Sequence, residues 1–297
     1  MRLRLHAWIL ASRPRTWPAA AAPVALGCAL AWHAGQFKTV PAALCLAFAW
    51  LTQIGANLAN DYFDFKKGAD TPERLGPTRA VAAGLIAPAT MWRAALGVLA
   101  LAFAVGCGLI YFGGVWLMVI GVASVVAALA YTGGPYPLGY HGWGDVCAWF
   151  FFGPVAVAGT YYVQAGWPVP PELWPVATAC GLLTANILVV NNVRDAATDA
   201  RAGKRTLVVR FGRRFALWQY AASFMFAMLT PAFLVLAGYP PVVLAAMATY
   251  VLGRWLMWRL GTLAEGDGPG FNRLLARTAQ VLALWAALLS AGLILAK

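Results

Sequence analysis

The sequence predicts an all-α membrane protein, built as a bundle of nine transmembrane helices. The chain has 297 residues and is 62% hydrophobic and 11% charged, less than half of the roughly 25% charge typical of soluble domains. Charge-free stretches of 51 and 39 residues follow Arg93 and Arg214. Because one span needs about 20 apolar residues, each stretch should hold two helices or nearly so. The alternating pattern of a membrane barrel is absent, which leaves helices as the spanning elements.

The apolar segments place the spans within one membrane-embedded domain, residues 1–297. Two charge-free stretches of 22 residues each flank Lys38 and supply the first two spans, and the two longest stretches supply the third, fourth, seventh and eighth. The nine spans are expected near residues 16–35, 40–60, 92–112, 115–131, 146–164, 173–192, 215–236, 240–260 and 277–296.

The basic residues predict how the bundle is oriented. A net charge of +12 would suggest a nucleic-acid partner in a soluble protein. With the N-terminus in the cytoplasm, 20 of the 22 Lys and Arg lie on the cytoplasmic side or at cytoplasmic helix ends, and only Lys38 and Lys297 do not. This asymmetry follows the positive-inside rule. We therefore expect a multi-pass protein of the cytoplasmic (inner) membrane, surrounded by lipid, without a nucleic-acid partner.

A cluster of amides and acids follows the second expected span. If the span continues as a helix, Asn57, Asp61 and Asp64 are spaced i, i+4 and i+7 and share one face, while Asn60 and Asp64 are also four residues apart. A second cluster follows the sixth span, where Asn191, Asp195 and Asp199 are spaced i, i+4 and i+8. Two helices thus bring the same stripe to the same, cytoplasmic, membrane boundary.

These stripes predict a Mg²⁺-dependent diphosphate site. Carboxylates crowded on one face repel each other, and Mg²⁺ binds a few carboxylates together with waters and substrate phosphates. Basic residues follow both clusters and provide phosphate contacts. The expected catalytic residues and metal ligands are Asp61, Asp64, Asp195 and Asp199, with Asn57 and Asn191 as further ligands; the expected diphosphate contacts are Asn57, Asn60, Arg79, Asn191 and Lys204. The alternative is simple pairing of these acids with neighbouring Lys and Arg at a wet helix end.

Three further features belong to the same membrane boundary. Arg13 precedes the first span and is a candidate for binding the carboxylate of an acceptor. Asp145 lies in a Gly-rich turn, either as a helix N-cap or as an acceptor-binding residue. The loop from Tyr131 to Tyr140 is rich in Gly and Pro, and we expect it to cover the site.

The paired motifs resemble those of the UbiA superfamily of intramembrane prenyltransferases. Asn60-Asp61-x-x-Asp64 is similar to its first aspartate-rich motif, Asp195-x-x-x-Asp199 to its second, and the segment from Gly203 to Gly212 to the residues after the second motif. One departure is Gly68, which stands where the commonest pattern has a third acid; the next acid is Asp70. The resemblance covers nearly the whole chain and implies a nine-helix bundle that transfers a prenyl group.

Other segments resemble the menaquinone branch of this family, the 1,4-dihydroxy-2-naphthoate prenyltransferases. They are residues 11–16, 57–62, 68–70, 76–79, 131–139 and 142–145. The resemblance implies Mg²⁺-dependent transfer from polyprenyl diphosphate to 1,4-dihydroxy-2-naphthoate, with loss of CO₂ and diphosphate, giving demethylmenaquinone. The alternatives are another aromatic acceptor, such as 4-hydroxybenzoate or homogentisate, and a cation-coupled transporter, which would place its acids near the bilayer midplane.

Overall fold

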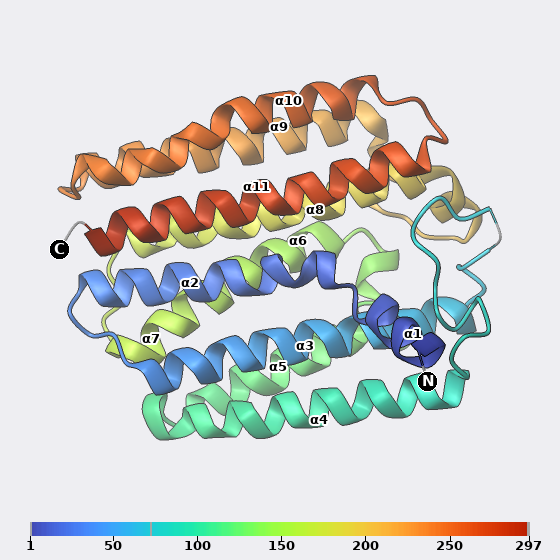
Figure 1. Ribbon diagram of the computed structural model, residues 1–297, viewed down its shortest axis with the longest axis horizontal. Helices are drawn as coiled ribbons and strands as arrows, with labels where there is room; N and C mark the ends of the chain where they lie inside the picture. The colour runs from blue at the N-terminus through green and yellow to red at the C-terminus, as the bar shows by residue number, and fades with distance from the viewer. Residues whose placement is uncertain (1, 72, 296–297) are drawn as a thin grey trace.

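The described residues, 2–71 and 73–295 of a computed structural model, form an elongated bundle of roughly parallel and antiparallel helices (Figure 1). No strand occurs in these ranges, so the predicted all-α class is confirmed. In chain order the elements are α1 (Arg2–Ser12), η1 (Pro14–Thr16), α2 (Trp17–His33), α3 (Thr39–Lys66), α4 (Pro88–Gly113), α5 (Trp116–Ala130), η2 (Leu138–Tyr140), α6 (Gly144–Phe150), η3 (Phe151–Ala158), α7 (Gly159–Ala165), α8 (Leu173–Arg201), α9 (Leu207–Leu236), η4 (Pro241–Thr249), α10 (Tyr250–Thr262) and α11 (Gly268–Leu295).

Each expected span coincides with a helix or a continuous run of helices. Within the described residues, seven of these segments are long and apolar enough to cross a membrane. The other two, α2 with 17 residues and α5 with 15, are shorter, so the count of nine spans stays a prediction. Residues 296 and 297, which include the end of the ninth expected span and Lys297, lie outside the described residues.

Two expected spans are not regular α-helices throughout. The fifth passes through a π-helix, η3, which contains Pro154. The eighth begins as a 3-10 helix, η4, which starts at Pro241 and follows Pro240. Proline removes a backbone donor and crowds the preceding turn, which favours such departures from α geometry.

Helix η3 approaches α8 very closely at a pair of glycines. A Cβ on Gly181 would collide with the carbonyl oxygen of Trp149, and a Cβ on Gly153 would lie 2.5 Å from the carbonyl oxygen of Ala177. Small residues allow the two backbones to come this close. In a membrane, helices associate through van der Waals packing rather than through the hydrophobic effect, so such contacts stabilise the bundle. The contact fixes one wall of the cavity described below.

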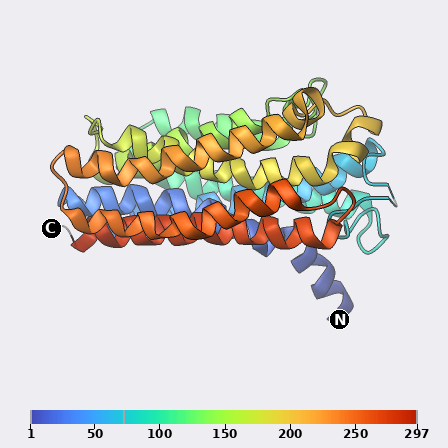
Figure 2. The same cartoon turned by 90° about the horizontal axis from the view of Figure 1, so that it is seen from above.

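The loops that carry the predicted site gather at one end of the bundle. Residues 67–71, 73–87, 131–143 and 202–206 and helix α1 all lie there, while α11 ends at the opposite end (Figures 1 and 2). Helix α1 projects obliquely from the bundle axis (Figure 2). Both aspartate motifs therefore occupy one end of the molecule, which we call the aspartate end.

Candidate active site

A cavity of about 400 Å³ begins among charged residues at the aspartate end and continues between apolar helix faces. On α3 its lining extends from Asp64 to Cys45, 19 residues apart, which corresponds to a helical rise of about 28 Å. The deeper lining includes Phe48, Leu109 and Leu117. The polar lining includes Arg13, Asn57, Asn60, Asp64, Arg74, Arg79, Tyr140, Asn191, Asp195, Asp199 and Lys204. The cavity thus joins an ionic head to a long apolar tail.

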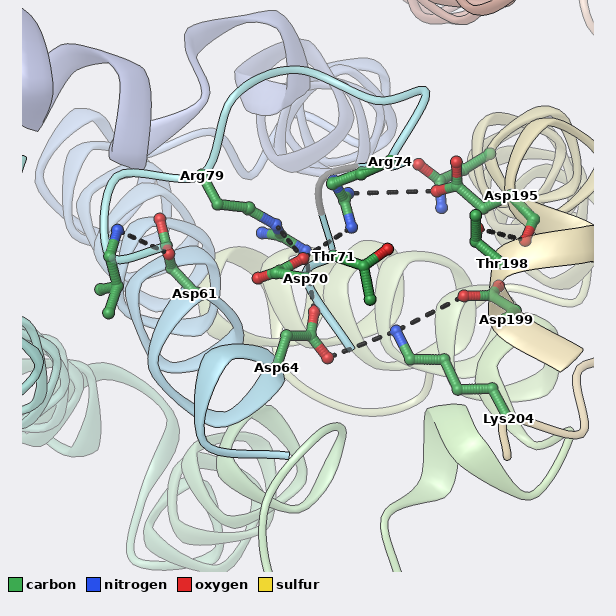
Figure 3. A network of polar contacts seen from close by, with 12 residues as sticks. Asp61, Asp64, Asp70, Thr71, Arg74, Arg79, Asp195, Thr198, Asp199 and Lys204 are labelled. Carbon is green, nitrogen blue, oxygen red and sulfur yellow. Dashed lines mark hydrogen bonds and ion pairs between the residues drawn. The ribbon is translucent and has the colours of Figure 1, made fainter. Parts of the chain in front are cut away.

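Asp64 is the centre of the ionic head (Figure 3). Its Oδ2 accepts a hydrogen bond from Arg79 Nη2 at 2.8 Å, and its Oδ1 accepts one from the Tyr140 hydroxyl at 2.9 Å. Lys204 Nζ lies 3.3 Å from the same Oδ1. Burial and the neighbouring Asp64 charge raise the pKa of Tyr140, which keeps its hydroxyl protonated as a donor.

Lys204 connects the two aspartate motifs. Its Nζ lies 3.3 Å from Asp64 of the first motif and 3.6 Å from Asp199 of the second. It also lies over the Tyr140 ring, 4.7 Å from the centroid. Burial alone would lower the pKa of Lys204, but the charges of Asp64 and Asp199 raise it above its usual value. The ammonium group is therefore charged and holds two carboxylates that would otherwise repel each other.

Asp195 is held by the arginine that precedes it. The Nε and Nη2 atoms of Arg194 lie 2.8 and 2.6 Å from its two carboxylate oxygens. The same guanidinium donates to Asn191 and to Asn272 on α11, both at 2.7 Å. Sequence reasoning missed Arg194, because neighbouring residues on a helix do not normally face each other, and it missed Asn272, because this contact between α8 and α11 depends on the tertiary fold.

The loop after α3 supplies a second layer of charge. Asp70 Oδ1 lies 2.8 Å from Arg74 Nη1 and 3.3 Å from Arg79 Nε. Arg74 Nη2 in turn lies 4.0 Å from Asp195 Oδ2. Asp70 thus orients the two arginines between the motifs, and the Asp70 Oδ2 atom is buried without a hydrogen-bond partner. Burial and repulsion by Asp64 raise the pKa of Asp70 to about 6.

Asp61 differs from the other motif acids. It is buried, and its carboxylate accepts hydrogen bonds from the backbone N–H groups of Ala80 and Val81 at 3.1 and 3.2 Å. It is not among the residues that line the cavity. In this conformation Asp61 fixes the loop that carries Arg79, and its role as a metal ligand stays a prediction.

The predicted amides all line the cavity but are partly engaged. Asn57 donates to the carbonyl oxygen of Ser12 at 3.0 Å, which ties α3 to the segment before α2. Asn60 Oδ1 accepts from Thr132 Oγ1 at 2.8 Å, and Asn191 Oδ1 accepts from Arg194. Asn57 and Asn60 thus join the cavity wall to its covering segments, whereas Asn191 bonds within α8.

Arg13 lies at the cavity with an unused donor. It adopts a left-handed backbone conformation (φ 52°) between α1 and η1, which is uncommon for a non-glycine residue and is often associated with function. Its Nη2 is buried without a hydrogen-bond partner. Burial lowers the pKa of Arg13, and the charge of Arg74 acts in the same direction. An anionic substrate group would satisfy this donor.

Asp145 takes another position. It lies in the first turn of α6, where Trp143 is the N-cap residue, so the N-cap interpretation is wrong. Its carboxylate accepts from Gln219 at 3.1 Å and from Asn192 at 3.5 Å, and it does not line the cavity. It therefore cross-links α6, α8 and α9, and acceptor binding by Asp145 stays a prediction.

The loop from Tyr131 to Tyr140 covers the ionic head, as predicted. Its residues Tyr131, Thr132, Gly139 and Tyr140 line the cavity. The Tyr140 carbonyl accepts from the Arg205 backbone N–H at 2.7 Å, which connects this loop to the segment after the second motif. Lys67 donates to the Thr132 carbonyl at 2.7 Å and holds the loop from the other side.

The donor set fits Mg²⁺ in kind. Asp64, Asp195 and Asp199 line one end of the cavity together with amide side chains, and Asp199 meets Lys204 through only one of its carboxylate oxygens. Among the described residues, no group of three or more His, Cys, Asp or Glu side chains forms a ready metal cluster. The carboxylates are held by Lys204 and the arginines, so metal binding requires these cations to shift toward a substrate anion.

The sequence profile of the UbiA prenyltransferase family matches residues 20–270. The chain belongs to the UbiA prenyltransferase family. It is 42% identical to 1,4-dihydroxy-2-naphthoate octaprenyltransferase of Escherichia coli (strain K12), in an alignment of 215 residues that covers 70% of each chain. It is 34% identical to the enzyme of the same name from Mycobacterium leprae (strain TN), over 97% of this chain and 96% of that one.

A solved relative has the same fold. The structure of a UbiA homolog from Archaeoglobus fulgidus bound to GPP and Mg²⁺ aligns with a TM-score of 0.67 and 18% identity, over 97% of this chain and 99% of that one. The family and the seven apolar helices make this an integral membrane protein. The aspartate motifs lie at one end of the bundle rather than at its middle, which argues against the transporter alternative.

Proposed function

We propose that this protein transfers a polyprenyl group from polyprenyl diphosphate to 1,4-dihydroxy-2-naphthoate, releasing diphosphate and CO₂. The observation that carries the proposal is the cavity itself, in which both aspartate motifs and their cations meet at the head of a long apolar tail. The relatives named as 1,4-dihydroxy-2-naphthoate octaprenyltransferases support the acceptor. The whole chain is one membrane-embedded domain, with nine spans, a cytoplasmic N-terminus and an active site facing the cytoplasm of the inner membrane.

The ionic head binds the diphosphate. Lys204, Arg74 and Arg79 line this region, and Arg79 Nη1 is buried without a hydrogen-bond partner. Guanidinium and ammonium donors aimed at the leaving oxygens stabilise the charge that grows as the allylic C–O bond breaks. When bound between the motifs by Asp64, Asp195 and Asp199, Mg²⁺ would supply further neutralisation of the diphosphate.

The apolar tail binds the prenyl chain and excludes water. Its lining from Phe48 to Leu117 offers no charged group to the chain. As the diphosphate leaves, the allylic carbon becomes electron-deficient and the electron-rich naphthoate ring attacks it. The ring carbon that bears the carboxylate forms the new C–C bond, and the C–C bond to CO₂ breaks to restore the aromatic ring. Arg13, whose unsatisfied Nη2 lies at the cavity, binds that carboxylate before it leaves.

The test uses purified protein in detergent with Mg²⁺, a long-chain polyprenyl diphosphate and 1,4-dihydroxy-2-naphthoate. Mass spectrometry should show demethylmenaquinone, formed as its quinol, in a 1:1 ratio with released CO₂, and EDTA should abolish the product. Asp64→Asn should abolish turnover, whereas Lys66→Met, which changes an exposed lysine at the same helix end, should not. Product from 4-hydroxybenzoate or homogentisate alone would overturn the acceptor; no product from any acceptor would overturn the reaction.

A further inference from the structure

A second pocket lies outside the catalytic cavity, between α10 and α11. Its volume is about 260 Å³, and it shares no lining residue with the cavity of the candidate active site. Its lining consists of Trp255, Trp258, Arg259, Gly270, Arg273, Leu274 and Arg277. Three arginines and two tryptophans thus surround one small space, and neither the proposed reaction nor the aspartate motifs use them.

The three arginines are unpaired. Arg259, Arg273 and Arg277 form no salt bridge and no side-chain hydrogen bond within residues 2–71 and 73–295. Arg277 lies over the Trp255 ring at 4.9 Å, and Arg259 lies 5.8 Å from the centroid of Trp258. Three positive charges in one pocket repel each other unless an anion joins them, so the pocket is electrostatically incomplete as it stands.

The nearest acids along the chain do not complete it. Glu265 and Asp267 lie in the loop between α10 and α11. The Asp267 carboxylate instead accepts a hydrogen bond from the backbone N–H of Gly270 at 2.8 Å and caps the start of α11. A bound anion would supply the negative charge that neither of these acids provides.

The position of the pocket points to the membrane surface. Asn272, in the first turn and a half of α11, donates to the Leu75 carbonyl, so α11 begins at the aspartate end. Arg277 is nine residues beyond the first residue of α11, about 14 Å along the helix. The pocket therefore lies near the end of α11 at the aspartate end of the bundle, at the level where we expect the lipid headgroups. Basic side chains at this depth are attracted to anionic lipids, and tryptophans favour this interface.

The neighbouring surface is apolar, as a lipid would require. Trp255 and Trp258 are exposed on α10, and Val251 and Leu252, one to two turns closer to the bilayer middle, are exposed as well. Arg273 and Arg277 are also exposed. A phosphate bound by the arginines would place its attached acyl chains along this face of α10, whereas a free phosphate would leave the face unused.

We propose that the pocket between α10 and α11 binds the phosphate headgroup of an anionic phospholipid. Arg259, Arg273 and Arg277 bind the phosphate oxygens, and Trp255 and Trp258 contact the glycerol and upper acyl chains. Basic pockets between transmembrane helices recognise anionic headgroups in this way.

The test measures thermal unfolding of the full-length protein in detergent, with phosphatidylcholine, phosphatidylglycerol, cardiolipin or inorganic phosphate added. The test variant is Arg273→Gln/Arg277→Gln. The matched control is Arg93→Gln/Arg214→Gln, which removes the same charge from two exposed arginines outside the pocket. The anionic lipids should raise the Tm of the wild type and of the control by several degrees more than phosphatidylcholine does, and the test variant should lose most of this difference.

Three results would overturn the proposal. An equal Tm rise with all lipids would show that headgroup charge is not recognised. An equal loss in the test and control variants would reveal a general surface-charge effect. A Tm rise with inorganic phosphate that matches the anionic lipids and disappears in the test variant would assign the pocket to a soluble anion. The assay contains no substrate, so its outcome is independent of the proposed reaction.

Discussion

Replacing Lys204 by methionine removes the charge that joins the two aspartate motifs while keeping most of the side-chain volume. Lys204 Nζ lies 3.3 Å from Asp64 and 3.6 Å from Asp199, and the side chain is only 13% exposed. At an effective dielectric constant of about 20, each contact carries roughly 5 kcal/mol of direct attraction, most of which is offset by desolvation. A charge-assisted hydrogen bond retains about 1.5–3 kcal/mol net.

We expect Lys204→Met to lower kcat/KM for polyprenyl diphosphate by about 10- to 150-fold, if one such bond to the leaving diphosphate is lost. Lys204→Arg should retain more activity than Lys204→Met because it keeps the charge. The assay is steady-state turnover with varied polyprenyl diphosphate at saturating acceptor, on protein that elutes as a single species from size exclusion.

Lys66→Met is the matched control. Lys66 is an exposed lysine at the end of α3 that carries Asp64, and its side chain makes no hydrogen bond, ion pair or ring contact within the described residues. It should leave kcat/KM within about twofold of the wild type, since removing an exposed, unpaired charge costs little. Lys204→Met with activity equal to that of this control would refute the reasoning that Lys204 contacts the diphosphate.

Three further outcomes follow from the geometry. Arg79→Lys cannot span Asp64 and Asp70 as the guanidinium does, so KM for the diphosphate should rise about tenfold or more; an unchanged KM would contradict this. Because the folded-state pKa of Asp70, about 6, lies above its ordinary value, its ionisation costs stability as pH rises through 6. Going from pH 7.5 to 5 should therefore stabilise the wild type by roughly 1 kcal/mol relative to Asp70→Asn; parallel denaturation curves at both pH values would argue against it. Gly181→Val forces a side chain into the Trp149 carbonyl and should destabilise the protein by about 1–3 kcal/mol, visible as a lower Tm.

The residues that the sequence placed correctly are those whose position follows from helical spacing at a span end. Asp64, Asp195 and Asp199 line one cavity because each lies in the last two turns of a long helix, and the two helices end at the same end of the bundle. Asp61 shows the limit of that reasoning. At about 100° per residue, Asp61 lies roughly 60° from Asp64 around the helix, which is close enough to count as one face. Its carboxylate nevertheless accepts hydrogen bonds from the backbone of Ala80 and Val81 and does not line the cavity.

The residues that sequence reasoning missed lie either in irregular segments or on helices where a long side chain makes an unusual contact. Tyr140 and the pairing of Asp70 with Arg74 lie in loops without periodicity, where contacts depend on the tertiary fold. Arg194 reaches its neighbour Asp195 only because its long side chain curls back. The π-helix η3 and the 3-10 helix η4 are almost entirely apolar, so their sequences show no hydrophobic periodicity. Without that periodicity, the sequence cannot distinguish these helix types from an α-helix.

The salt-bridge network of the ionic head is electrically neutral by itself. Asp64, Asp70, Asp195 and Asp199 are matched by Arg74, Arg79, Arg194 and Lys204, four charges of each sign. A diphosphate entering alone would upset this balance with excess negative charge, and a divalent cation entering alone would upset it in the other direction. Each ligand therefore lowers the cost of admitting the other, which is positive thermodynamic linkage. The apparent affinity for the prenyl donor should consequently rise with Mg²⁺ concentration, and the affinity for Mg²⁺ with that of the donor, so that the site loads its two charged ligands together.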